Sequence, residues 1–312
     1  MIGVLAGLLL RVLVVLTGVA LATFALLWHA PGDPALAIAL ARYDTAVSQE
    51  LVDFIRAETG FDDGFWTAFW GWLAPLLQGD FGQSSVNGRD VWPDLVTAMS
   101  YTFPLALVSL GIGLAISVPL ALIATRRPGS WLDRGAVAVA SVGVAIPAFW
   151  LGLLLILLFA VQLGWLSAIG AETATLCILP AMTLGFGVAA SLTRIIRSGI
   201  LEARGQPFLP AFYRRGVAQR DIARDHIAPH AAVPVVTVLG LELAFLLEGL
   251  VVVEVIFARP GLGSFLVSAI FARDFPKVQA VVILAAVIFV VVNLTIDLIY
   301  RSLDPRVGGR DA

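Results

Sequence analysis

The stretch MSYTFPLALVSLGIGLAISVPLALIAT at residues 99–125 has no charged side chain and is long enough to cross a lipid bilayer as a helix. A helix rises about 1.5 Å per residue, so roughly 20 apolar residues cover a hydrocarbon core about 30 Å thick. Similar apolar runs recur along the chain. The sequence therefore predicts an all-α, polytopic membrane protein with about six spans, at residues 9–29, 99–125, 136–163, 177–200, 233–254 and 278–300.

The composition supports this class. Hydrophobic residues make up 59% of the 312 residues and charged residues only 13%, whereas soluble proteins have about 25% charged residues. The regular ten-residue alternation of a membrane barrel is missing, so helices must satisfy the backbone hydrogen bonds. We expect prolines inside the spans to bend their helices, at Pro104, Pro119 and Pro147. The apolar run up to Trp28 exceeds a usual signal core, so we expect a retained first span.

Basic residues are distributed unevenly across this topology. Of the 20 Lys and Arg residues, 14 fall on one side, in segments 1–11, 126–134, 194–232 and 301–312. Because cytoplasmic segments are enriched in basic residues, we expect both termini in the cytoplasm. The predicted organisation is a first membrane helix at 1–30, an extracytoplasmic loop at 31–97, a five-helix core at 98–300 that includes a cytoplasmic loop at 201–234, and a cytoplasmic tail at 301–312.

The extracytoplasmic loop has apolar residues at three- and four-residue spacing. This spacing predicts amphipathic helices that lie along the membrane surface, around Leu51, Val52 and Ile55 and again at Phe65, Trp66, Phe69, Trp70, Leu73, Leu76 and Leu77. Trp66, Trp70 and Trp72 fit an interfacial aromatic belt better than an aromatic substrate box. The sequences PGDP at 31–34 and GDFG at 79–82 predict turns at the two ends of the region.

Motifs for nucleotide binding, metal binding and hydrolysis are missing. The only lysine, Lys277, lies in the sequence FPKV, which excludes a G-x-x-x-x-G-K-[ST] loop. The three histidines and Cys177 form no metal-ligand pattern or disulfide pair, and no G-x-S-x-G occurs. We therefore expect a non-catalytic chain with no cofactor and no metal, and we expect Cys177 to be a packing residue.

The sequence FYRRGVAQRDIARDHIAPHAAVP at residues 212–234 concentrates arginine between two apolar runs. Positive loops help to set topology, but seven arginines at 194–232 exceed what topology alone requires. Arginine pairs with carboxylates in a bidentate geometry that lysine cannot copy. The segment therefore predicts contact with a partner in water.

Several motifs stand together in the order of a known family. They are PGDP at 31–34, GDFG at 79–82, LPA at 179–181, LEGLVVVEVIFARPGLG at 247–263, RDFP at 273–276 and Asp304-Pro305-Arg306. Over nearly its whole length the chain resembles inner-membrane permease subunits of ABC importers for dipeptides, oligopeptides and nickel, and in particular the first of the two permeases. The resemblance implies the type I ABC importer permease fold.

The resemblance also implies a function and a set of partners. The expected cargo is a short peptide, with nickel or a metal chelate as the alternative. The partners would be a second homologous permease, cytoplasmic ATPase subunits, an extracytoplasmic substrate-binding protein and membrane lipid in a bacterial inner membrane, with no nucleic acid. An ATP-independent secondary transporter or channel is the alternative from another class, but neither an inverted repeat nor an acidic filter is evident.

In that family the cytoplasmic loop docks on the ATPase. The resemblance therefore implies coupling residues Arg214, Arg215, Gly216, Arg220, Asp221, His226 and Pro234. The chain departs from the family pattern at FYRRG, residues 212–216, and at Pro207 and Pro210, which break the helix expected upstream. We expect a diverged docking surface.

Ionisable groups within the last two spans are functional candidates by default. Glu242, Glu248 and Glu254 are six residues apart, which places successive members about 120° apart around a helix, so they cannot line one face. Glu248, where the family generally has glycine, is expected to be buried near mid-span. It either faces the translocation path and favours a cationic ligand, or is protonated against a neighbouring helix. Glu254, Asn293 and Asp297 are expected to be structural, with Asp297 near Arg301.

Overall fold

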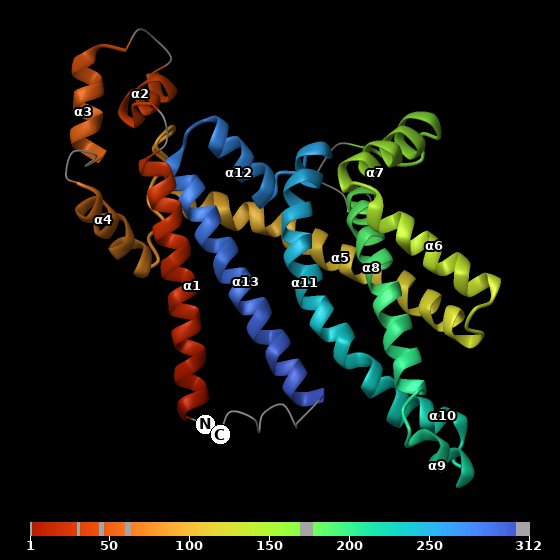
Figure 1. Cartoon of the computed structure of the whole chain (residues 1–312). Helices are drawn as coiled ribbons and strands as arrows, with labels where there is room; N and C mark the ends of the chain where they lie inside the picture. Colours follow the sequence, from red (N-terminus) through yellow and green to blue (C-terminus); the bar gives the residue numbers. More distant parts are fainter. Residues whose placement is uncertain (1, 30–31, 44–46, 60–63, 169–176, 304–312) are drawn as a thin grey trace. The chain divides into compact units, whose positions relative to one another are not determined.

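The computed structural model describes residues 2–29, 32–43, 47–59, 64–168 and 177–303 (Figure 1). Helices dominate these residues, and the one β-pairing reported within them is a single bridge between Gln83 and Asp90. The predicted all-α fold is confirmed. The chain divides into two compact units: unit 1 comprises Met1–Tyr101 and Pro260–Val290, and unit 2 comprises Thr102–Arg259 and Val291–Ala312.

Each unit has its own set of helices. Unit 1 holds α1 (Ile2–Trp28), α2 (Pro34–Tyr43), α3 (Gln49–Thr59), α4 (Phe65–Leu77) and α12 (Leu262–Phe271). Unit 2 holds α6 (Trp131–Ala145), α7 (Ala148–Leu155), η1 (Ile156–Gln162), α8 (Ile178–Arg204), α9 (Leu209–Arg214), α10 (Gln219–Ile222), η3 (Ala223–Ile227) and α11 (Ala228–Ile256). Two long helices, α5 (Val91–Arg126) and α13 (Phe275–Leu303), have residues in both units.

Within the described residues, five helices are long and apolar enough to cross a membrane, namely Leu10–Trp28, Val91–Arg126, Ile178–Arg204, Gln219–Ile256 and Phe275–Ile299. The span predicted at 136–163 is instead a pair, Trp131–Ala145 and Ala148–Gln162, bent by 101°. The break lies at Pro147, because a proline has no N–H to donate and disfavours the α conformation of the residue before it, here Ile146. The bend at Pro147 is confirmed, but one continuous helix over 136–163 is wrong.

The predicted loop at 201–234 is mostly helical. The fifth predicted span does not begin near residue 233, since its apolar helix is continuous with α10 and η3 from Gln219 onward. Pro229 occupies the first turn of α11, directly after the π-helical turn η3. Pro234 lies inside α11 and is therefore part of the helix, not of a loop.

The two amphipathic helices predicted within residues 31–97 are part of unit 1. Both predicted helices form, as α3 and α4. However, the apolar face of α3 is covered by α2, since Val52 and Ile55 are buried in one cluster with Ile38 and Ala39. Burying a side chain of this size contributes roughly 1.5–3 kcal/mol, which favours packing between the two helices over exposure.

Helix α4 packs on α1 through aromatic rings. The Phe24 ring centroid lies 5.4 Å from those of Phe65 and Phe69 and 5.6 Å from that of Trp72. Offset and edge-to-face pairs at such distances are favourable beyond their buried area. Trp66 and Trp70 are 61% and 57% exposed, so they remain available for the predicted interfacial belt.

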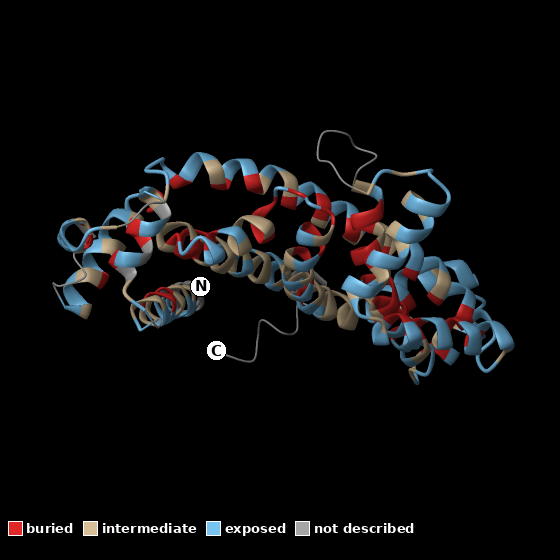
Figure 2. Ribbon diagram, turned by 90° about the horizontal axis from the view of Figure 1, so that it is seen from above, coloured by how far each residue is buried: buried red, intermediate tan, exposed pale blue. Residues whose placement is uncertain are grey.

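Helix α8 is the central element of unit 2 and packs against α6, α7 and α11. Small residues permit a close approach: a Cβ added at Gly113 of α5 would lie 2.5 Å from Val188 of α8. Close backbone approach through small residues is typical of helices packed within membranes. Outside these packed surfaces much of the ribbon is exposed, as the pale blue positions in Figure 2 show.

Candidate functional site

The arginine-rich segment, residues 205–227, is attached to unit 2 by its apolar side chains. Leu209, Ile222 and Ile227 are buried and belong to the main hydrophobic cluster of that unit. Phe208 and Phe212 pack against the same cluster. The apolar side of α9, α10 and η3 therefore fixes the segment on the helical bundle, and its polar side faces outward.

Gly216 ends α9 in a Schellman motif. The Gly216 N–H donates to the Tyr213 carbonyl at 3.1 Å and the Val217 N–H to the Phe212 carbonyl at 3.2 Å. This pair of bonds requires a left-handed residue, and Gly216 has φ +73°. A Cβ at Gly216 would meet nothing within 4 Å, so the backbone conformation, not lack of space, favours glycine there.

The predicted coupling residues separate into outward and inward groups. Arg214, Arg215, Gly216 and Arg220 are exposed. Within the described residues no ion pair forms at Arg215 or Arg220, whereas Arg224 Nε lies 2.7 Å from Asp225 Oδ1. The Arg224 guanidinium also lies 3.9 Å from Asp221. The outward face therefore presents arginines that no carboxylate of the described chain neutralises.

His226 and Pro234 belong to the inward group. The His226 ring centroid lies 4.1 Å from that of Phe212, and the His230 ring lies 5.6 Å from Phe208. Pro234 is half-buried in α11, and its Cγ would lie 3.3 Å from a Cβ added at Gly199 of α8. The structure thus leaves Arg214, Arg215, Gly216 and Arg220 exposed and Asp221 half-buried, and it places His226 and Pro234 in packing contacts.

Two of the seven arginines at 194–232 serve the bundle itself. Arg197 of α8 makes a bidentate bond to Asp133 of α6, with Nε 2.5 Å from Oδ1 and Nη2 2.8 Å from Oδ2. Arg204 donates to the Thr125 carbonyl at the end of α5. That contact places the α5–α6 turn and the arginine-rich segment at the same end of unit 2. The Arg197–Asp133 pair was not predicted from the sequence, although Asp133 is the only acidic residue of the basic segment 126–134.

The acidic residues of α11 have three different surroundings. Glu254 is fully buried and accepts a 2.6 Å hydrogen bond from the Thr102 hydroxyl. Glu242 is half-buried, bonds to the Ser191 hydroxyl and lines a groove of about 130 Å³. Glu248 is exposed on this chain, so the expectation that it is buried is wrong within the chain, while its role stays a prediction.

Asn293 and Asp297 lie in the part of α13 that belongs to unit 2. Asn293 is half-buried and Asp297 is exposed. The predicted contact of Asp297 with Arg301 lies outside the described side chains, as does the Asp304-Pro305-Arg306 motif.

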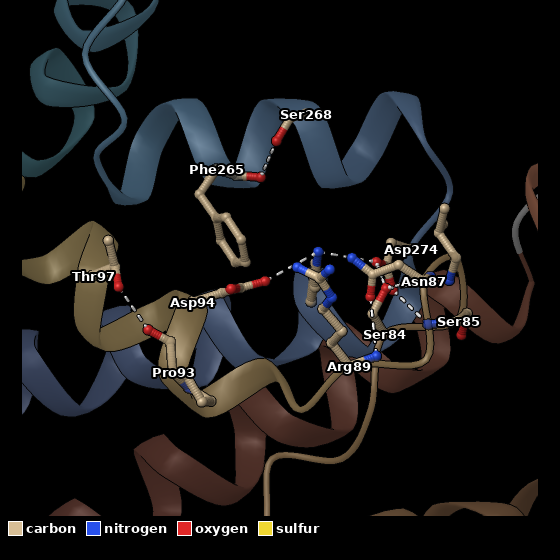
Figure 3. A network of polar contacts seen from close by, with 12 residues as sticks. Ser84, Ser85, Asn87, Arg89, Pro93, Asp94, Thr97, Phe265, Ser268 and Asp274 are labelled. Carbon is tan, nitrogen blue, oxygen red and sulfur yellow. Dashed lines mark hydrogen bonds and ion pairs between the residues drawn. The ribbon is translucent and has the colours of Figure 1, made fainter.

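Unit 1 contains a polar network that joins two of the family motifs (Figure 3). Asp274 is buried and accepts hydrogen bonds from the Ser84 hydroxyl at 2.5 Å and from the Ser85 N–H at 2.9 Å. Lys277 Nζ lies 3.6 Å from Asp274 and 3.4 Å from Asp94. The segment after GDFG is therefore held against the α12–α13 turn, a long-range contact that the two motifs alone do not reveal.

Solved structures define the class to which this fold belongs. The chain is similar to MetNI, described as "Inward facing conformations of the MetNI methionine ABC transporter", with TM-score 0.55, 23% identity, and coverage of 67% of this chain and 95% of that chain. It is also similar to "an amino acid ABC transporter", with TM-score 0.54, 20% identity, and coverage of 67% and 94%. The fold is that of an ABC transporter permease.

Sequence relatives narrow the class. The glutathione transport system permease protein GsiC of Escherichia coli (strain K12) is 35% identical over 277 residues, which cover 89% of each chain. The GsiC of Pectobacterium atrosepticum has the same identity and coverage. Residues 117–309 match the family described as "Binding-protein-dependent transport system inner membrane component". The chain belongs to this family, which confirms the resemblance to ABC importer permeases of the inner membrane.

The Asp274 network generates a stability prediction. Replacing Asp274 with Ala leaves the Ser84, Ser85 and Lys277 donors without their shared acceptor, which should cost about 3 kcal/mol. We expect the thermal unfolding midpoint of the purified chain to fall by several degrees. Asp94→Ala, which removes the more exposed partner of Lys277, should cost about 1 kcal/mol or less. Equal shifts for the two variants would contradict a central role for Asp274.

Proposed function

We propose that this chain is one of two membrane subunits of an ATP-driven importer for short peptides. The observation that carries the proposal is the 35% identity to GsiC over 89% of both chains, because glutathione is itself a short peptide. Nickel or a metal chelate is the alternative cargo within the same group of importers. Cargo choice then depends on the binding protein as well as on the membrane path.

The proposal includes three kinds of protein partner. A second homologous permease completes the path, and an extracytoplasmic substrate-binding protein delivers cargo to the loop at 31–97. Cytoplasmic ATPase subunits supply energy, because the chain has no nucleotide-binding G-x-x-x-x-G-K-[ST] loop. Both termini are cytoplasmic in this arrangement, and residues 98–300 form the core of the path.

We assign the ATPase contact to the outward face of the arginine-rich segment. Its exposed arginines suit carboxylates on a partner, and Arg215 and Arg220 have no competing ion pair within the described residues. Its opposite side is buried in unit 2 through Leu209, Ile222 and Ile227. A displacement of this segment is therefore passed to α8 and α11. To drive transport, the ATPase must bind one state of the bundle more tightly than the other.

We assign Glu248 to the translocation path. It lies at the centre of an exposed face of α11. The residues of this face are three or four positions apart, and the others are Leu241, Phe245, Val252 and Val255. A charged side chain at the centre of a bilayer costs roughly 2.5–3.5 kcal/mol, so this face is unsuited to lipid. A carboxylate facing the path favours cargo that carries an ammonium group, as a free peptide amino terminus does.

The cargo assignment is tested by reconstitution. The chain is extracted gently with its partners, placed in proteoliposomes with ATP on the ATPase side, and supplied with binding protein on the other side. We expect ATP-dependent uptake of labelled glutathione or other di- and tripeptides, and no uptake of labelled nickel. Nickel uptake without peptide uptake would overturn the peptide assignment.

The ATPase contact is tested by charge reversal. Arg214→Glu together with Arg215→Glu should repel the partner, because two attractive pairs become repulsive ones. We expect recovery of the ATPase with the purified chain to fall about tenfold or more, while the amount of inserted chain is unchanged. Arg89→Glu reverses another exposed arginine, in unit 1, and is the control. Retention of the ATPase by the double variant would refute the assignment.

The role of Glu248 is tested by charge removal. Glu248→Gln keeps the size of the side chain but removes its charge. It should slow uptake of peptides with a free amino terminus about tenfold, the effect of one lost ion pair, and slow uptake of amino-acetylated peptides less. Glu242→Gln is the matched control on the same helix, because Glu242 points elsewhere and bonds to Ser191. If both variants alter the preference equally, Glu248 has no special position in the path.

A further inference from the structure

A groove lies between the first turns of α6 and the second half of α8. It has a volume of about 460 Å³ and is lined by Gly129, Asp133, Arg134, Val137, Ala138 and Arg197. Neither the transport mechanism nor the family motifs assign a role to this groove. Its lining combines two guanidinium groups with aliphatic side chains, which is an unusual surface for a helix in contact with acyl chains.

The Asp133–Arg197 pair gives the groove a fixed wall. Asp133 has only 3% of its side chain exposed, and the Gly129 N–H donates to its Oδ2 at 2.8 Å. Arg197 uses Nε and Nη2 for Asp133 and keeps 26% of its side chain exposed. The carboxylate is therefore neutralised and the guanidinium is held in one orientation, with Nη1 outside that bidentate bond.

The remaining charge of the groove is positive. Arg134 is exposed, and within the described residues no carboxylate pairs with it. Arg126 and Arg127, both exposed, precede Gly129 in the same turn. With Asp133 already neutralised by Arg197, these arginines leave an unbalanced cationic surface. Positive-inside topology explains the charge of the turn, but it does not explain a groove with an oriented arginine in its wall.

The face of α6 beside the groove is apolar and suits an acyl chain. Trp131, Gly135, Ala138 and Val142 are exposed at four-, three- and four-residue spacing, so they lie along one stripe of the helix. Ala138 also lines the groove. Trp131, 80% exposed, is of the residue type that gathers at the headgroup level of membranes. The cationic groove and the acyl-compatible stripe therefore adjoin each other.

We propose that this groove binds an anionic phospholipid, whose phosphate contacts Arg134 and Arg197 and whose acyl chain lies along Trp131, Ala138 and Val142. Basic pockets between membrane helices are suited to acidic headgroups. A free phosphate would use the arginines but would gain nothing from the apolar stripe. The bound lipid joins α6 to α8 at the end of unit 2 where the arginine-rich segment begins.

The test compares lipid retention by the full chain in mixed vesicles and in native mass spectrometry. The probes are phosphatidylglycerol and phosphatidylcholine with identical acyl chains. We expect the wild-type chain to retain phosphatidylglycerol in preference, and Arg134→Gln to weaken that preference about fivefold, which corresponds to one lost arginine contact. Arg194→Gln is the matched control, because Arg194 is exposed on α8 but does not line the groove. It should retain the wild-type preference.

Three results would overturn the proposal. The first is no preference for phosphatidylglycerol in the wild-type chain. The second is an equal loss in Arg134→Gln and Arg194→Gln, which would indicate general attraction between a basic surface and acidic lipid. The third is displacement of the lipid by millimolar inorganic phosphate, which would indicate a phosphate site. Thermal unfolding in phosphatidylcholine alone checks folding, and a similar midpoint for both variants makes the comparison valid.

Discussion

The rest of this structure depends on one constraint: backbone N–H and C=O groups within the membrane must form hydrogen bonds inside the chain. In hydrocarbon, an unpaired N–H or C=O costs several kcal/mol, so each span is a helix and each interruption needs compensation. Three helix ends use the same solution. Gly216, Ala258 and Arg273 each adopt positive φ and close paired hydrogen bonds over the last turn of α9, α11 and α12. Two of these positions have side chains, at a conformational cost of roughly 1–2 kcal/mol each.

The polar side chains follow a related division. Asp133, Glu254 and Asp274 are buried, and each accepts hydrogen bonds from a neighbouring element. Arg215, Arg220 and Glu248 are exposed, and within the described residues none of them forms an ion pair. The first group fixes helices in place, and the second group carries the proposed contacts with cargo and partners. Burial and hydrogen bonding, more than residue type, separate the two groups.

The sequence was sufficient for the features that depend on local composition. Uncharged runs located the spans, Pro147 located a break, and the spacing of Phe65 and Phe69 predicted α4. It was insufficient where a distant segment decides the outcome. The apolar face of α3 has the same pattern whether it meets lipid or α2, and the exposure of Glu248 depends on how α11 is rotated against α8. The Arg197–Asp133 pair likewise joins residues 64 positions apart, beyond the reach of any helical periodicity.

The contact between Ser84 and Asp274 has a consequence for biosynthesis. These residues are 190 positions apart, and unit 1 is built from two segments of the chain separated by most of unit 2. During synthesis from the amino terminus, the segment around Ser84 leaves the ribosome long before its acceptor exists. The helices between them must enter the membrane first. Unit 1 therefore cannot reach its native structure until the segment from Pro260 onward has been made, long after its segment around Ser84.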